Sequence, residues 1–258
     1  MSASLAINDD HQRVNIPILM YHDIRSVGQP ITPLSLPVAQ FERQLDLLVR
    51  WGFTTLSFAR LFEVLRGRLP MPAKPVVLTF DDGYASFHDL VWPMCSARQM
   101  SATVFLLANG IGGSNHWDAA NGVPQVSLMD DAQVRSVLKG GMELGVHGWN
   151  HRRLMECAES EIREEVVKSK HLLEEKFGQV QTVYCYAYGK FDARLFPVMR
   201  EAGYQGAVAI DCAWKKTTSE LFAMRRIHIH EKDDGWRFLA KLTPPYLWHL
   251  GYKQSRAQ

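Results

Sequence analysis

The chain alternates short apolar runs with longer amphipathic segments over most of its length. Eight of the apolar runs are hydrophobic almost throughout, which is typical of strands that are buried on both faces of a parallel sheet. These runs are IPILMYH (16–22), FTTLSF (53–58), PVVLTF (75–80), ATVFLL (102–107), MELGVHG (142–148), TVYCYAYG (182–189), GAVAI (206–210) and AMRRIHIH (223–230).

Helical patterns fill several of the intervals between these predicted strands. The segment VAQFERQLDLLVRWG places its apolar residues on one stripe and stops at Gly52. The segment ESEIREEVVKSKHLLEEKFG does the same and ends at Gly178, in the position of a helix C-terminal glycine. Further helices are expected over residues 84–99, 130–139 and 192–202.

Strands that alternate with helices predict βαβ units and an α/β fold. The number of candidate strands favours a distorted (β/α) barrel of the TIM type, with about seven to eight parallel strands. An open doubly wound sheet is the alternative, but no G-x-G-x-x-G follows the first strand to favour it. We expect a polar N-terminal segment over 1–15, the barrel over 16–240 and a surface tail over 241–258.

Composition and charge narrow the class of protein. The 29 basic and 27 acidic residues give a net charge of +2, which does not suggest a nucleic-acid partner. No apolar stretch approaches the ~20 residues that cross a bilayer. The start MSASLAINDDHQRVN lacks a secretory signal, which predicts a cytoplasmic location, or a periplasmic or extracellular one if a signal has been removed.

The cysteines are scattered without a C-x-x-C, so we interpret them as small buried hydrophobic residues: Cys95, Cys157, Cys185 and Cys212.

Polar side chains stand at the ends of several predicted strands. In an α/β barrel these ends meet at one face, where catalytic groups gather. The residues are His22, Asp81 with Asp82, His147 with His151, the segment 186–189, Asp211, and His228 with His230.

The histidines of H-G-W-N-H and the adjacent aspartates point to a metal centre. His147 and His151 can direct their imidazoles at one point if the segment between them makes a turn. Two imidazoles and one carboxylate form a three-ligand set that leaves a position open for water, as in a catalytic zinc site. One of Asp81 and Asp82 can then bind the metal, which offsets the repulsion between the two acids, while its neighbour serves as a general base.

Four motifs resemble those of a known enzyme family. LTFDDGY, LGVHGWNHRRL, YCYAYGKFD and EAGYQGA resemble the polysaccharide deacetylase family, carbohydrate esterase family 4. The opening ILMYHDI is similar to the branch that contains the poly-N-acetylglucosamine deacetylases, and the resemblance covers roughly residues 16–230.

The resemblance implies a distorted (β/α) barrel and a metal-dependent removal of acetyl groups from an N-acetylated sugar or polysaccharide. The cofactor would be a divalent metal, most often Zn²⁺, with Ni²⁺ or Co²⁺ in some members. Carried over to this sequence, the metal ligands would be Asp82, His147 and His151, and the base would be Asp81.

The resemblance also implies the remaining roles at the site. His22, in the M-Y-H motif, would be the general acid, with His230 as the alternative. The backbone N–H of Tyr188 would help to hold the oxyanion. The aromatic residues expected to contact substrate are Tyr186, Trp117 and Trp149.

The sequence departs from the family pattern at three positions. Cys185 stands where an arginine usually braces the catalytic aspartate, and Arg226 is a possible substitute. Ala187 replaces a proline beside the expected oxyanion donor. Gly148 lacks the hydroxyl that usually follows the first metal-binding histidine.

The sequence therefore predicts a hydrolase that removes an N-acetyl group from an amino sugar or a polysaccharide. Two alternatives stay open: the same metal barrel could hydrolyse a small non-sugar amide or cyclic imide, or it could be a catalytically inactive carbohydrate-binding protein. The sugar, the acyl group, the polymer length, the metal and the oligomeric state are not specified by the sequence.

Overall fold

Parallel strands close into a barrel at the centre of the molecule. The computed structural model describes residues 16–29, 34–210, 221–243 and 246. In this part of the chain seven parallel strands follow the order β1-β10-β9-β8-β7-β6-β5, and β5 pairs back onto β1. The strands are β1 (Ile18–Tyr21), β5 (Pro75–Phe80), β6 (Thr103–Leu106), β7 (Glu143–Val146), β8 (Val183–Cys185), β9 (Gly206–Ile210) and β10 (Met224–His228). The predicted distorted (β/α) barrel is confirmed.

A short eighth strand, β4 (Thr54–Thr55), pairs with the first residues of β5. All eight predicted runs contain a strand, but the run over 53–58 gives only these two residues. The reason is local: the side chain of Ser57 accepts the N–H of Arg60 at 3.2 Å and begins helix α2 (Phe58–Leu65). A second parallel pair, β2 (Asp23–Arg25) with β3 (Ser35–Pro37), follows β1 and was not predicted.

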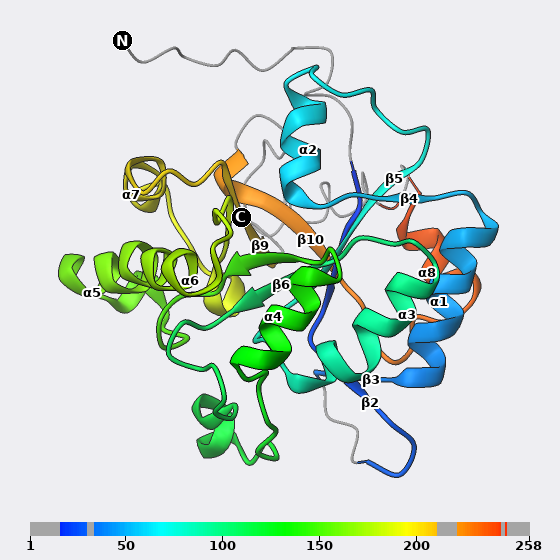
Figure 1. Ribbon diagram of the computed structural model, residues 1–258, viewed down its shortest axis with the longest axis horizontal. Helices are drawn as coiled ribbons and strands as arrows, with labels where there is room; N and C mark the ends of the chain where they lie inside the picture. The colour runs from blue at the N-terminus through cyan, green and yellow to red at the C-terminus, as the bar shows by residue number, and fades with distance from the viewer. Residues whose placement is uncertain (1–15, 30–33, 211–220, 244–245, 247–258) are drawn as a thin grey trace.

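Helices lie around the strands on the outside of the barrel (Figure 1). Asp130 and Gln133 form a reciprocal capping box that begins α4. Among the described residues, no helix is both long enough and apolar enough to cross a bilayer. Besides α2, the α-helices are α1 (Val38–Arg50), α3 (Trp92–Ala97), α4 (Asp131–Lys139), α5 (Glu159–Arg163), α6 (Ser169–Phe177), α7 (Leu195–Glu201) and α8 (Trp236–Lys241).

Shorter helical turns connect or extend these helices. Two of them have π geometry and continue directly into an α-helix: η2 (Phe87–Val91) runs into α3, and η5 (Glu164–Lys168) joins α5 to α6. The remaining turns are of the 3₁₀ type: η3 (His116–Asn121), η4 (Leu154–Glu156), η6 (Ala187–Gly189) and η7 (Leu221–Ala223).

The core has two parts, because alternate side chains of each strand face opposite sides of the barrel wall. In β5, Val77 packs inside the barrel, whereas Val76 and Leu78 pack under the helices. Strands that are buried on both sides have no polar face, and this explains the near-continuous apolar runs. The interior cluster consists of Ile18, Leu56, Phe58, Leu61, Phe62, Val77, Phe105, Val183, Cys185, Val208 and Met224.

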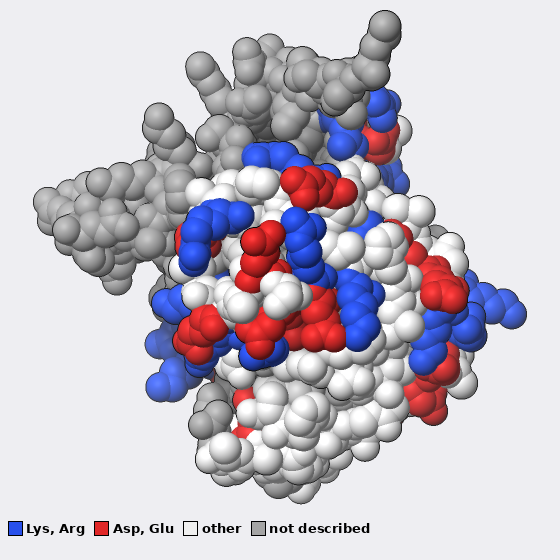
Figure 2. Space-filling view, turned by 90° about the vertical axis from the view of Figure 1, so that its left-hand side faces the viewer, with Lys and Arg blue, Asp and Glu red and all other residues white. Residues whose placement is uncertain are grey.

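Charges of both signs are interspersed on the side of the molecule that lies at the left in Figure 1 (Figure 2). Many are paired within or next to α5, η5 and α6. Examples are Arg152–Glu161, Arg163–Glu159, Lys168–Glu164 and Lys176–Asp131. Exposed pairs of this kind contribute little to stability, about 0–1 kcal/mol each, and they give this face a field of mixed sign.

Gly145 in β7 leaves room for a large side chain inside the barrel. A Cβ atom at this position would lie 2.5 Å from Cδ1 of the Phe105 ring. We predict that Gly145→Ala lowers the free energy of unfolding by about 1–3 kcal/mol in urea denaturation, because it overpacks the interior. The loss should shrink in a Phe105→Leu background, where the ring is absent. Equal losses in the two backgrounds would show that Phe105 does not impose the constraint.

Candidate active site

The two adjacent aspartates follow β5 at the end of the barrel where the other strand-end polar residues gather. Asp81 donates its backbone N–H to the Tyr21 carbonyl at 3.0 Å, which fixes the end of the strand against β1. Asp82 then takes a left-handed conformation with φ of 71°, and Gly83 follows with φ of 75°. Aspartate tolerates this region better than most residues. The turn allows the neighbouring carboxylates to reach different partners.

The Asp82 carboxylate meets two imidazoles. Its Oδ1 atom lies 3.3 Å from His147 Nε2 and 3.4 Å from His151 Nε2. All three side chains are buried, and their potential ligand atoms lie within 4.8 Å of one another. His147 follows β7, and His151 reaches the same point from a left-handed backbone conformation with φ of 59°. The structure thus brings together the three residues that were expected to bind metal.

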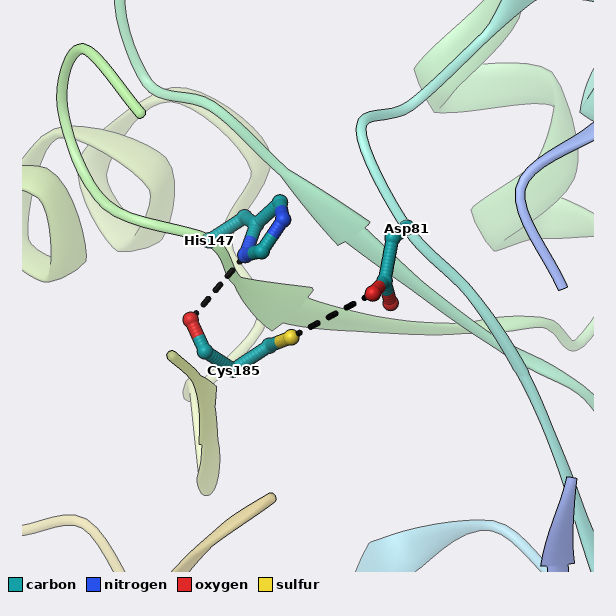
Figure 3. Close-up of side chains that lie close together, drawn as sticks. All are labelled: Asp81, His147 and Cys185. Atoms are coloured by element: carbon teal, nitrogen blue, oxygen red, sulfur yellow. Dashed lines mark hydrogen bonds between the residues drawn. The ribbon is translucent and has the colours of Figure 1, made fainter. Parts of the chain in front are cut away.

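A hydrogen bond to the Cys185 carbonyl group sets the orientation of the His147 ring. Its Nδ1 atom lies 3.0 Å from the Cys185 carbonyl oxygen, which can only accept, so Nδ1 carries a hydrogen and Nε2 is the nitrogen that faces Asp82. Figure 3 shows this contact together with the Cys185 thiol, whose Sγ lies 3.6 Å from Asp81 Oδ2. Asp81, His147 and Cys185 could also be considered as a metal-ligand group. Arg226 lies 3.1 Å from the sulfur, and a guanidinium in that place disfavours a second cation.

The Asp82–His147–His151 cluster fits a divalent metal. Within the described residues, Asp82 Oδ1 is buried and has no hydrogen-bond donor, although two imidazole nitrogens face it. Burial lowers the pKa of His151 to about 4, so this side chain is in its neutral, ligating form at neutral pH. Burial alone would raise the pKa of Asp82, but His147 and His151 outweigh it and lower this pKa. One ionised carboxylate and two imidazoles form a donor set that suits Zn²⁺.

Asp81 is held by Arg226, which projects from β10 into the barrel. The guanidinium makes two parallel contacts, Nη1 to Oδ1 at 2.5 Å and Nη2 to Oδ2 at 2.6 Å, and neither side chain is more than 2% exposed. Burial alone would raise the pKa of Asp81, but the charge and hydrogen bonds of Arg226 outweigh it and place the pKa well below its usual range. The structure therefore places Arg226 against Asp81, where a brace was expected from the sequence.

Three histidine rings, those of His22, His228 and His230, form a row that begins beside Asp81. His22 Nε2 lies 3.8 Å from Asp81 Oδ2, and its ring centroid lies 5.8 Å from that of His228. His228 in turn contacts His230, with 3.8 Å between the ring centroids. His230 is exposed, whereas His22 is only 10% exposed. Of the two histidines considered as the acid, the structure places His22 at the Asp81 carboxylate.

Tyr188 and Trp117 border the cluster on the side of His151. The Tyr188 ring lies 4.5 Å from the His151 ring, and its backbone is left-handed with φ of 56°. Trp117 belongs to the Gly/Asn-rich segment after β6, and its ring centroid lies 4.9 Å from that of His151. Asn115 is fully buried and holds this segment together, since its Oδ1 accepts the N–H of Val126 at 2.6 Å.

The other two aromatic residues lie further from the cluster. Trp149 is half-buried, and the Lys168 ammonium group lies 3.9 Å from its ring centroid. Tyr186 is fully buried, stacks on Phe191 and donates its hydroxyl to the Phe222 carbonyl at 3.0 Å. Alternation beyond β8 turns this side chain toward the helices, away from the barrel interior. This placement does not support a substrate contact by Tyr186.

Glu165 is a buried carboxylate next to the site that the sequence analysis missed. It accepts the N–H groups of Trp149 and Asn150, in the loop between the two histidines. The available signal was its position three residues after Ile162, on the apolar stripe of the predicted helix. Asp211, also considered at a strand end, lies outside the described residues.

Comparisons with known sequences agree with this geometry. The sequence model of the polysaccharide deacetylase family matches residues 68–207, more than half of the chain. The protein named "Putative polysaccharide deacetylase YxkH" of Bacillus subtilis is 25% identical over 223 residues, which cover 86% of this chain and 74% of that protein. The poly-beta-1,6-N-acetyl-D-glucosamine N-deacetylase of Escherichia coli K12 is 25% identical over 224 residues, 72% of this chain and 32% of that longer protein.

Solved structures share the fold. The Streptococcus pyogenes deacetylase PplD, in complex with acetate, superposes with a TM-score of 0.76 at 22% identity over 90% of this chain and 99% of that one. IcaB from Ammonifex degensii gives a TM-score of 0.69 at 18% identity over 92% and 96% of the two chains. The family match contains Asp81, Asp82 and both histidines of the cluster. This chain belongs to the polysaccharide deacetylase family, whose members are enzymes that deacetylate carbohydrates.

Proposed function

We propose that this protein is a metal-dependent hydrolase that removes the acetyl group from an N-acetylated amino sugar, alone or within a polysaccharide. One observation carries the proposal: two imidazoles converge on a single buried oxygen of Asp82, directly beside the ionised Asp81. The family match supports carbohydrate deacetylation. Relatives named as poly-beta-1,6-N-acetyl-D-glucosamine N-deacetylases suggest that sugar as the first substrate to test.

Asp82, His147 and His151 would hold the metal. Their one-oxygen, two-nitrogen donor set suits Zn²⁺, and imidazole-containing sets also accept Ni²⁺ or Co²⁺. When bound, such an ion lowers the pKa of water and polarises the acetyl carbonyl. The hydrogen bond from His147 Nδ1 to the Cys185 carbonyl, at 3.0 Å, fixes the tautomer that ligation requires.

Asp81 would act as the general base. It takes a proton from the attacking water, whose oxygen forms a bond to the acetyl carbon. Arg226 keeps this carboxylate ionised and holds it in one orientation through two short hydrogen bonds. A base with a lowered pKa is weak, so the arrangement favours orientation of the carboxylate over basicity.

His22 would act as the general acid and the Tyr188 backbone as an oxyanion donor. The carbon–nitrogen bond breaks when His22 gives a proton to the sugar nitrogen, so that an amine leaves instead of an amide anion. The N–H of Tyr188 would donate to the carbonyl oxygen as it gains negative charge. The products are acetate and the free amino sugar.

Trp117 is the stronger candidate for contact with a sugar ring. It is half-buried and lies beside His151, so a sugar stacked on it would also be close to the cluster. Trp149 lies against Lys168, which occupies one side of its ring. We propose Trp149 only as a more distant contact for a longer chain of sugars.

Two substitutions distinguish the role of the general base from that of the metal ligands. We predict that Asp81→Asn lowers kcat for acetate release by about 10²–10⁴-fold, since the proton acceptor is lost, and keeps one Zn²⁺ per chain. His147→Ala should lose both activity and bound metal, whereas the exposed His171→Ala should keep both. Acetate release is measured from poly-β-1,6-N-acetylglucosamine oligomers, chito-oligosaccharides and a cyclic imide, and metal content by mass spectrometry. Full activity of Asp81→Asn, or turnover of the imide alone, would contradict the proposal.

The general acid can be tested with two kinds of leaving group. We predict that His22→Ala lowers kcat on the sugar amide by about 10²–10⁴-fold but affects an aryl acetate much less, because a phenolate leaves without protonation. His230→Ala should behave like wild type on both substrates, because the exposed His230 ring contacts His228. If His230→Ala shows the selective loss instead, His230 is the acid.

The Asp81–Arg226 pair should make stability depend on pH. Since folding lowers the pKa of Asp81, the unfolded chain binds more protons in acid, and this stabilisation is lost as pH falls below about 4. Arg226→Met leaves a buried carboxylate unpaired. It should lower the free energy of unfolding by about 3–5 kcal/mol at neutral pH and abolish or reverse the acid-dependent loss, because burial without Arg226 raises the pKa of Asp81 and its protonation then favours the folded state. Urea denaturation across this pH range measures both effects, and an acid-dependent loss in Arg226→Met as large as in wild type would contradict this role.

A further inference from the structure

The loop between His147 and His151 rests on a buried carboxylate. Glu165 is 1% exposed, and its Oε2 accepts the Trp149 N–H at 2.7 Å. The Asn150 N–H lies 3.0 and 3.1 Å from the two carboxylate oxygens. A charged acceptor bonded to two consecutive N–H groups makes stronger hydrogen bonds than a neutral acceptor would. It therefore fixes the backbone of the segment that separates the two imidazoles.

The opposite edge of the same loop is held by the residues that follow β6. Ala108 donates its N–H to the Gly148 carbonyl at 3.0 Å, and Asn109 donates its N–H to the Trp149 carbonyl at 3.2 Å. These bonds satisfy the carbonyl groups of the loop, while Glu165 satisfies its N–H groups. Hydrogen bonds therefore hold both the carbonyl and the N–H groups of the loop, and Glu165 in η5 accepts those from the N–H groups.

Gly148 leaves the space that the Glu165 carboxylate occupies. A Cβ atom at Gly148 would overlap Glu165 Oε2 and would lie 3.2 Å from the Tyr184 hydroxyl. The φ of 98° at Gly148 is also one that only glycine adopts readily. A side chain at 148 and the carboxylate at 165 therefore compete for the same space.

The helix that carries Glu165 has an irregular turn at this point. Residues Glu164–Lys168 form the π-helical segment η5 between α5 and α6. The Ser169 hydroxyl donates to the Glu165 carbonyl at 2.5 Å and lies 3.4 Å from the Val166 carbonyl. Insertions of this kind occur often at functional sites in proteins, because they re-aim one side chain of a helix.

We propose that Glu165 is a positioning residue for the metal centre, and that its carboxylate sets the separation of His147 and His151 through the backbone of the loop. The inference rests on the proposed function, because Glu165 can position a metal centre only if Asp82, His147 and His151 bind a metal. The hydrogen bonds of Glu165 go to the loop backbone, so it acts on the imidazoles only through the loop and takes no part in the chemical steps. Its effect is to keep the ligand set assembled before the metal arrives.

A purely structural role for Glu165 can be distinguished by a matched control. Glu143 is also a buried carboxylate that accepts two consecutive backbone N–H groups, from Phe58 at 2.7 Å and Ala59 at 2.8 Å. It also accepts the Thr103 hydroxyl at 2.6 Å. Glu143 begins β7, and His147 follows its last residue, so the two lie at opposite ends of one strand. Loss of Glu143 should therefore weaken the fold without disturbing the metal ligands.

The test compares Glu165→Gln with Glu143→Gln in the full chain. We expect both variants to lower the stability of the metal-free protein in urea. Glu165→Gln should also weaken Zn²⁺ binding by about 10–100-fold in competition with a chromophoric chelator, while Glu143→Gln binds like wild type. If Glu165→Gln does not fold, Glu165→Asp should show the same selective loss to a smaller degree.

Two results would overturn the inference while the proposed function stands: wild-type Zn²⁺ affinity in the Glu165 variants, or an equal loss in Glu143→Gln. Failure of the proposed function gives a different result. Wild-type protein would then bind no Zn²⁺, or His147→Ala would bind it as tightly as wild type does, and in either case the inference falls with the metal centre.

Discussion

The two carboxylates of Asp81 and Asp82 lie side by side and are almost completely buried, and both have lowered pKa values. An ionised carboxylate that is buried without a partner is unfavourable, because burial disfavours the charged form of an acid. They coexist because the left-handed turn at Asp82 gives each acid its own partners: Arg226 for Asp81, and two imidazoles for Asp82. The other features of the site serve to keep these partners in place.

The barrel makes this division of partners possible. Parallel strands deliver their last residues to one end, so Asp81, His147 and Cys185 meet there although they are far apart in sequence (Figure 3). The apolar interior below them contains residues such as Phe105, whose ring contacts Arg226, and the Asp81–Arg226 pair is buried above it. A buried ion pair adds little to net stability, but the loss of one partner strongly destabilises the protein. The main effect of the Asp81–Arg226 pair is therefore to fix the orientation of the Asp81 carboxylate, and its contribution to the stability of the fold is small.

Sequence reasoning predicted the barrel because strands buried on both faces leave near-continuous apolar runs. Because residues at parallel strand ends share one face, it also predicted that one of Asp81 and Asp82 lies with His147 and His151, and the family resemblance selected Asp82. The apolar stripe indicated that Glu165 could be buried, but not that it contacts the loop between the histidines, because that contact depends on tertiary packing and on a π-helical turn. Tyr186 was misplaced for a simpler reason: the side-chain alternation beyond β8 turns it into the helical layer.

Anomalous diffraction at the zinc absorption edge, from crystals of the protein loaded with Zn²⁺, would show directly whether Asp82, His147 and His151 bind the metal. We predict one strong peak at about 2.0–2.2 Å from an Asp82 carboxylate oxygen and from Nε2 of both His147 and His151. The Asp81 carboxylate should remain on Arg226. A peak on other residues, or no ordered peak in a metal-saturated crystal, would show that these three residues do not form the metal centre.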